Sequence, residues 1–205
     1  MPQIARLKIT LDHVAPAVMR RIEVPTDISL DDLHLVIQRA MPWQNYHFYE
    51  FRVGRSLAWG IADPDSNFED LWRDAAKATL ADLLNQGGRK AFTYTYDFGD
   101  SWDHSIKVEA IAEAVAGLAY PRLLAAKGAC PPEDIGGPWG YAEYLKAIAD
   151  PNHQNHAEMI EWGDPDFDPA VADEAVIQDS FAKIAKYLAN RKGSSVRRPR
   201  IKRSA

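Results

Sequence analysis

The segment from Phe92 to Glu109 constrains the fold more than any other stretch, because apolar residues alternate with polar ones on both sides of a turn. The apolar positions are Phe92, Tyr94, Tyr96 and Phe98 before the turn, and Trp102, His104, Ile106 and Val108 after it. A period of two is typical of half-buried strands. A slip of one residue would turn one strand over, so the two apolar faces must coincide. The segment therefore predicts an antiparallel β-hairpin.

The length of the turn decides which residues face each other across this hairpin. A two-residue turn would set Tyr94 opposite Ser105, which pairs apolar positions with polar ones. A loop of three or five residues, with Tyr96 opposite His104, keeps one face apolar throughout. Longer loops that contain Gly are common in hairpins. We therefore predict the longer loop and the Tyr96 and His104 pair.

This register bears on the chemistry of the turn, "DFGDSWDH". It places Asp97 opposite Asp103 on the polar face and turns His104 toward the core, which argues against a catalytic pair of Asp97 and His104. We expect His104 to cap the core through a hydrogen bond to Tyr96 or to a backbone carbonyl group. Asp100 follows a glycine and is typical of a turn residue.

The rest of the chain supplies further strands first and then helices. Alternating residues predict strands at 5–11, 18–24 and 47–53, and residues 54–67 have the composition of a loop. Helical spacing predicts helices from Ser29, as an N-cap, to Met41, within 68–84, from Pro138 to about Ile148, at 157–162 and at 173–190. Strands in hairpin pairs followed by grouped helices indicate an α+β fold. We expect one domain over residues 1–190, with a mainly antiparallel sheet and helices packed on one face.

Composition agrees with a single globular domain in the cytoplasm. A chain of 205 residues, 46% of them hydrophobic, buries roughly 70% of its unfolded surface. It contains no apolar window of about 18 residues and does not begin like a signal peptide, so we expect no membrane association. The single Cys130 cannot form an internal disulfide, which suits a reducing compartment.

The charge is distributed unevenly along the chain. Residues 191–205 contain seven basic residues and no acidic one, so the remaining 17 basic residues face 29 acidic ones and the body carries −12. We expect these last residues to be a disordered tail. Its candidate contact residues are Arg197, Arg198, Arg200, Lys202 and Arg203. Such a tail suits nucleic acid or an acidic protein surface, and the sequence leaves both partners open.

A second group of candidate residues lies in "CPPEDIGGPWGY", Cys130 to Tyr141. Two prolines force an extended path, and two glycines precede the start of a helix. One interpretation is a rigid loop that packs Trp139 and Tyr141 against the sheet; another is a loop that brings Glu133 and Asp134 into a cleft. Few cationic residues lie near Cys130 in the sequence, so nothing there supports the low thiol pKa of an activated nucleophile.

Together, four segments of the chain resemble the plasmid pRiA ORF-three-like family of bacterial proteins. They are "VMRRIEVPTDISLDDLHLVIQRAMPWQNYHFYEF", "YTYDFGDSWDHSIKVE", "CPPEDIGGPWGYAEYL" and "WGDPDFDP", in the family's order within residues 4–190. The resemblance implies a compact α+β domain, often encoded on plasmids or near mobile elements. The family has no assigned catalytic residues, so none is transferred to this chain.

These observations favour a binding or adaptor module, associated with nucleic acid through its tail, over an enzyme. Its candidate recognition residues are Trp102, His104, Trp139 and Tyr141. The alternative is a metal-dependent hydrolase whose acidic residues come from both loops: Asp97, Asp100, Asp103, Glu133 and Asp134. The sequence assigns no metal ligands and identifies no cofactor, since two carboxylates without a third ligand in one stretch are a weak metal signal.

Overall fold

The computed structural model describes residues 2–54, 57–61, 72–87, 90–164 and 166–196. Its strands are β1 (Gln3–Leu11), β2 (Met19–Pro25), β3 (Tyr49–Val53), β4 (Leu57–Gly60), β5 (Trp72–Asp74), β6 (Ala91–Tyr96), β7 (Trp102–Glu113) and β8 (Arg122–Lys127). Its helices are α1 (Leu30–Ala40), the 3-10 helix η1 (Ala75–Lys77), α2 (Leu80–Gly87), α3 (Gly137–Ala149), α4 (His156–Trp162) and α5 (Glu174–Val196).

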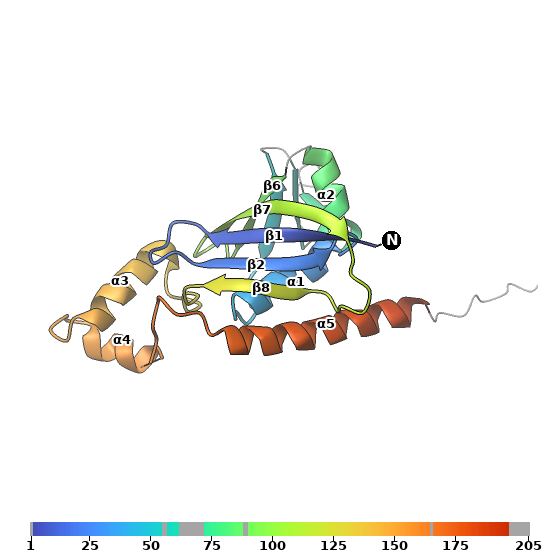
Figure 1. Cartoon of the computed structure of the whole chain (residues 1–205). Coiled ribbons are helices and arrows are strands. Elements are labelled where there is room, and N and C mark those ends of the chain that lie inside the picture. Colours follow the sequence, from blue (N-terminus) through green and yellow to red (C-terminus); the bar gives the residue numbers. More distant parts are fainter. Residues whose placement is uncertain (1, 55–56, 62–71, 88–89, 165, 197–205) are drawn as a thin grey trace, which may run out of the picture.

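All eight strands form one sheet, in the order β5-β4-β3-β6-β7-β1-β2-β8. Neighbouring strands are antiparallel except β4 and β5, which are parallel. Helix α5 lies along β8 and α1, whereas α3 and α4 pack together at one end of the sheet (Figure 1). The predicted α+β class and the mainly antiparallel sheet are confirmed.

The hairpin of β6 and β7 lies at the centre of the sheet, and its two apolar faces coincide as predicted. Its register differs by two residues, because Tyr96 faces Trp102 and Tyr94 faces His104. The cause is Asp97, which leaves the strand with a φ of 56° and starts a five-residue tip that ends at Ser101. The prediction that Asp97 faces Asp103 is therefore wrong.

Helix α1 begins as predicted, with the Ser29 side chain accepting a hydrogen bond from the amide of Asp32. It covers the sheet through a polar contact as well as apolar ones. The ring of His34 stacks on Tyr49 at 3.6 Å, and its Nδ1 lies 2.8 Å from the hydroxyl group of Tyr94. Its Nε2 lies 2.5 Å from Oδ1 of Asn45, which can only accept, so Nε2 carries the proton. Helix α1 thereby fixes the loop between itself and β3.

Other boundaries differ from the sequence prediction. Residues 57–60 form β4 where we predicted a loop, and 72–74 form β5 where we predicted a helix. Strand β8 was not predicted, and α5 runs six residues beyond the predicted end at Asn190. The tail residues Arg197, Arg198, Arg200, Lys202 and Arg203 lie outside the described residues.

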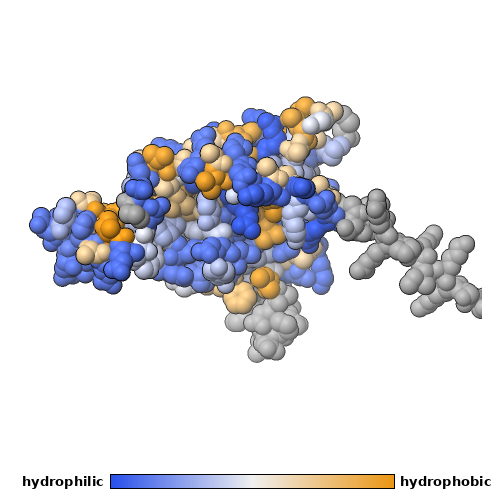
Figure 2. All heavy atoms as spheres, turned by 90° about the horizontal axis from the view of Figure 1, so that it is seen from below, coloured by the Kyte–Doolittle hydropathy of each residue, from blue (hydrophilic) through white to orange (hydrophobic). Residues whose placement is uncertain are grey.

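Figure 2 shows the side on which α5 lies in Figure 1. Hydrophilic residues cover most of this side, and hydrophobic residues form small separate groups, one of them at the end formed by α3 and α4. No helix in the described part of the chain is long and apolar enough to cross a membrane.

Candidate functional site

The tip of the central hairpin meets the Pro and Gly rich loop that precedes α3. The amide of Gly136 donates to the Asp100 carboxylate at 3.2 Å. Gly137 packs so tightly on the same residue that a Cβ atom there would overlap the carbonyl oxygen of Asp100. The two acidic loops that the sequence suggested as partners therefore form one surface.

A third segment joins them and contributes His47, which lies two residues before the start of β3. Its Nε2 lies 3.1 Å from Oδ1 of Asp134 and 3.6 Å from Oδ2 of Asp97. One ligand atom from each of these residues lies within 4.8 Å of the other two. In the described part of the chain, this is the one group of three or more His, Cys, Asp or Glu residues that meets this criterion for holding a metal ion.

The hairpin tip holds the carboxylate of Asp97 in place. Its Oδ1 accepts hydrogen bonds from the amides of Gly99 at 2.9 Å and Asp100 at 3.4 Å, while Oδ2 faces His47. Asp97 and Asp134 both have a left-handed backbone, with φ values of 56° and 59°. This conformation is uncommon for residues other than Gly, and residues that adopt it are found preferentially at functional sites.

Glu133, the neighbour of Asp134, fixes the loop that carries His47. It accepts hydrogen bonds from the Tyr96 hydroxyl group at 2.7 Å and from the amide of Gln44 at 2.7 Å. Burial, followed by the nearby Glu133 carboxylate, raises the pKa of Tyr96, so the phenol keeps its proton and donates. Both carboxylate oxygens of Glu133 therefore accept hydrogen bonds that hold this loop in place.

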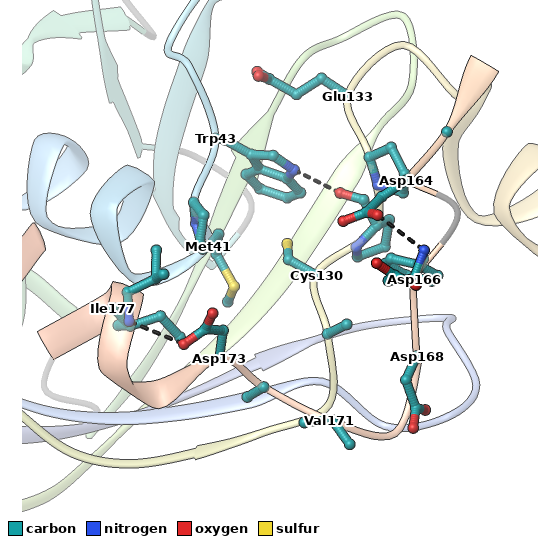
Figure 3. Close-up of a pocket in the computed structure, with 18 of the residues that line it drawn as sticks. Met41, Trp43, Cys130, Glu133, Asp164, Asp166, Asp168, Val171, Asp173 and Ile177 are labelled. Carbon is teal, nitrogen blue, oxygen red and sulfur yellow. Dashed lines mark hydrogen bonds between the residues drawn. The ribbon is translucent and has the colours of Figure 1, made fainter. Parts of the chain in front are cut away.

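A groove with a volume of about 940 Å³ is shown in Figure 3, and Asp134 of this cluster is one of the residues that line it. Its walls come from the loop after α1, from residues 129–134, from the segment after α4 and from the start of α5. Seven carboxylate residues line it: Glu133, Asp134, Asp164, Asp166, Asp168, Asp173 and Glu174. Asp134 belongs to both features, so the groove and the His47, Asp97 and Asp134 cluster are continuous.

The residues at the floor of the groove have structural roles and provide no reactive group. Trp43 donates from Nε1 to the carbonyl of Pro131 at 3.0 Å, which holds the extended Pro-rich segment in place (Figure 3). Burial raises the pKa of Cys130, so its thiol stays protonated at neutral pH. Arg20 is buried, and its guanidinium donates to carbonyl groups of β2, α1, β8 and the residue after β8. The guanidinium of Arg20, the one cation among the described lining residues, is thus already hydrogen-bonded to the backbone.

The structure separates the acidic candidates of the sequence. Asp97 and Asp134 enter the cluster, and Glu133 lies beside it. Asp100 serves the junction between the loops, as described above. Asp103 accepts from the Thr95 hydroxyl group at 2.6 Å on the polar face and is not part of the cluster.

The aromatic candidates also fall into two groups. Trp102, His104 and Tyr141 are buried, and the ring of His104 donates from Nδ1 to the carbonyls of Tyr94 and Trp102. The core position predicted for His104 is therefore observed. Trp139 is 85% exposed, contrary to the interpretation that packs it against the sheet.

Two parts of the site had no counterpart in the sequence prediction. His47 was assigned only to a strand, because nothing in its neighbourhood in the sequence resembles a metal motif. The acidic residues of "GDPDFDP" were noted only as part of a segment that resembles the family. Their density was the available signal, but only the fold places them opposite Glu133 and Asp134.

Comparisons with known proteins identify the family to which the chain belongs. The chain is 49% identical to the uncharacterised protein y4hQ of Sinorhizobium fredii over 188 residues, which is 89% of this chain and 95% of that protein. The crystal structure of MM3350, a protein of unknown function from Methanosarcina mazei Go1, has a TM-score of 0.76 and 34% identity, with 84% of this chain and 96% of that chain covered. The family model described as plasmid pRiA4b ORF-3-like protein matches residues 3–176. The chain therefore belongs to the plasmid pRiA4b ORF-3-like family.

Proposed function

We propose that this protein is a binding module whose acidic groove recognises a positively charged segment of a partner. The observation that carries this proposal is the set of seven carboxylate residues that line a groove of about 940 Å³. Arg20, the cation among the described lining residues, donates to four backbone carbonyl groups and makes no salt bridge with these carboxylates, so one positive charge faces seven negative ones. The groove is therefore an attractive site for Lys and Arg side chains.

The same charge argues against nucleic acid as the occupant of the groove. Phosphate groups would meet a wall of carboxylates and a body that carries −12 without its last 15 residues. Binding of nucleic acid by a protein relies on cations that neutralise phosphate. An association with nucleic acid thus concerns the basic tail, where it stays a prediction.

The groove also offers apolar surface. Trp162, Val171 and Val176 line it and are each about half exposed, at 47%, 59% and 50%. Exposed apolar side chains within a concave surface favour a ligand that has apolar groups beside its charges. An extended basic peptide with interspersed apolar residues satisfies both requirements.

The chain's own C-terminal sequence has this composition and provides a convenient probe. The groove contacts the first turn of α5, and the tail follows its last residue. Those ends lie about 34 Å apart along a helix of 23 residues. A separate peptide therefore tests the groove without depending on the path of the tail.

Fluorescence anisotropy with a labelled peptide of residues 196–205 tests the proposal on the full chain. We expect the peptide to bind and its affinity to fall as salt is raised, and a peptide with Gln in place of Arg and Lys not to bind. Replacing Asp164, Asp166 and Asp168 together with Asn should weaken binding about tenfold, from roughly 0.5 kcal/mol for each exposed ion pair.

A variant with the same change of charge is the control. Glu113, Glu143 and Asp179 do not line the groove, and their replacement by amides should leave the affinity within about twofold. Equal weakening in both triple variants would reduce the effect to net charge and would contradict the proposal. DNA or RNA binding that disappears when residues 193–205 are deleted would locate nucleic-acid recognition in the tail.

A further inference from the structure

We propose that His47, Asp97 and Asp134 form a binding site for one divalent transition-metal ion at the end of the acidic groove. The ligand atoms are Nε2 of His47, Oδ2 of Asp97 and Oδ1 of Asp134. They come from three segments that are far apart in the sequence: the loop before β3, the hairpin tip and the loop before α3. This site goes beyond the binding of a basic segment and shares only Asp134 with the groove carboxylates.

The two distances from His47 are close to those between ligands of one metal ion. Two ligand atoms that each lie about 2.1 Å from an ion, at tetrahedral or octahedral angles, are about 3.0 to 3.4 Å apart. The observed separations from Nε2 of His47 are 3.1 Å and 3.6 Å. The two carboxylate oxygens lie within 4.8 Å of each other, so they need to approach by at most about 1.8 Å for all three atoms to share one ion.

Hydrogen bonding alone does not account for the arrangement. Nε2 of His47 is covered from solvent, yet it has no hydrogen bond of acceptable geometry, although two carboxylates lie close to it. A single N–H group cannot serve both carboxylates in any case. Their mutual repulsion is offset when a divalent cation lies between them. A bound metal ion thus supplies the interaction that the imidazole of His47 and the two carboxylates lack within the protein.

Neighbouring residues already hold the candidate metal ligands in position. Oδ1 of Asp97 is held by two backbone amides, which directs Oδ2 toward His47. The ring of His47 packs edge-on against Tyr96 at 5.8 Å between centroids. Tyr96 in turn donates to Glu133, which precedes Asp134 in the sequence. Such contacts orient metal ligands and reduce the rearrangement that binding requires.

The chemistry of the ligands selects the class of ion. An imidazole nitrogen with two carboxylate oxygens suits Zn²⁺, Mn²⁺ or Fe²⁺, whereas Ca²⁺ and Mg²⁺ prefer oxygen atoms alone. Three protein ligands leave at least one coordination position for water or a ligand. The Asp134 side chain is 68% exposed, so the open side faces solvent and the groove.

The test uses tag-free, full-length protein that has been dialysed against a chelator. Equilibrium dialysis with Zn²⁺ and with Mn²⁺, followed by metal analysis, should give one bound ion per chain. Ca²⁺ and Mg²⁺ at the same concentrations should bind at least about tenfold more weakly. Asp134→Asn and His47→Gln should each weaken Zn²⁺ binding by at least about tenfold.

Two further variants separate this site from its neighbours. Asp166→Asn removes a carboxylate from the groove outside the cluster, and Cys130→Ser removes the nearby thiol; both should retain the wild-type affinity. Circular dichroism and thermal unfolding without metal should show that all four variants are folded. The proposal is overturned if folded Asp134→Asn binds Zn²⁺ as tightly as wild type, if Asp166→Asn or Cys130→Ser loses as much affinity, or if no ion binds stoichiometrically.

Discussion

Replacing Gly137 with Ala tests the junction on which the candidate site depends. Gly137 has a φ of +67°, and a Cβ atom there would come closer than 3.0 Å to the carbonyl oxygen of Asp100. The left-handed backbone costs a residue with a side chain about 1 to 2 kcal/mol. Moving Asp100 away also weakens the hydrogen bond from Gly136, which contributes about 1 kcal/mol. We expect a total loss of about 2 to 3 kcal/mol.

Gly54 provides a matched control, because its φ is +65° and nothing lies within 4 Å of a Cβ atom built there. Gly54→Ala should therefore cost only the backbone term of about 1 to 2 kcal/mol. Urea unfolding followed by circular dichroism gives both values from midpoints at equal slopes. Equal losses in the two variants would refute the tight junction. Gly137→Ala should also weaken Zn²⁺ binding, since it separates the loops that carry Asp97 and Asp134.

Three further predictions concern the core and its caps. Burial lowers the pKa of His34 and His104 to about 4 from an ordinary value of 6.5. Between these values the unfolded chain binds protons that the folded chain does not, so stability is complete above pH 6.5 and falls toward pH 4. The slope approaches about 2.7 kcal/mol per pH unit for two protons, and urea midpoints that stay constant across this interval would contradict it. Tyr94→Phe leaves two buried partners unsatisfied and should cost about 2 kcal/mol. Tyr141→Phe removes a buried hydroxyl group without a partner in the described structure and should be neutral within about 0.5 kcal/mol; equal losses in thermal unfolding would reject this distinction. Ser29→Ala removes the cap of α1 and should lower the unfolding free energy by about 1 kcal/mol, measured in urea.

The elements that were predictable from the sequence are those whose signals are local. The Ser29 cap and the apolar spacing after it identify α1, and alternation identifies the central hairpin with its buried face. The exact pairing of that hairpin was not predictable, because it depends on the backbone of Asp97 at the tip. Strand β8 has no alternating pattern of its own, and it forms by pairing with β2.

The candidate site was predictable only in part for the same reason. The two acidic loops stand out in composition, and they do meet in the fold. His47 could not be found, because it is 50 residues from Asp97 in the sequence and reaches it through the pairing of β3 with β6. The acidic wall at residues 164–174 depends on how the chain runs from α4 to α5, which no local pattern specifies.

Whether a metal ion binds here also bears on the alternative that the protein is a metal-dependent hydrolase. A hydrolase of the kind suggested by the acidic loops needs a cation that polarises a bond or activates water. Asp97 and Asp134 lie where such a cation would bind, but Asp103 lies elsewhere and Glu133 is engaged with Tyr96 and Gln44. Metal binding is thus a precondition of that activity, whereas recognition of a basic segment by the groove is independent of it.

The most direct test of the metal site is a crystal structure of the chain with Zn²⁺, using anomalous diffraction at the zinc absorption edge. The site predicts one anomalous peak about 2.0 to 2.2 Å from Nε2 of His47, Oδ2 of Asp97 and Oδ1 of Asp134. The peak should be absent in crystals of Asp134→Asn grown in the same way. A zinc peak elsewhere in the groove, with none between these three side chains, would contradict the account.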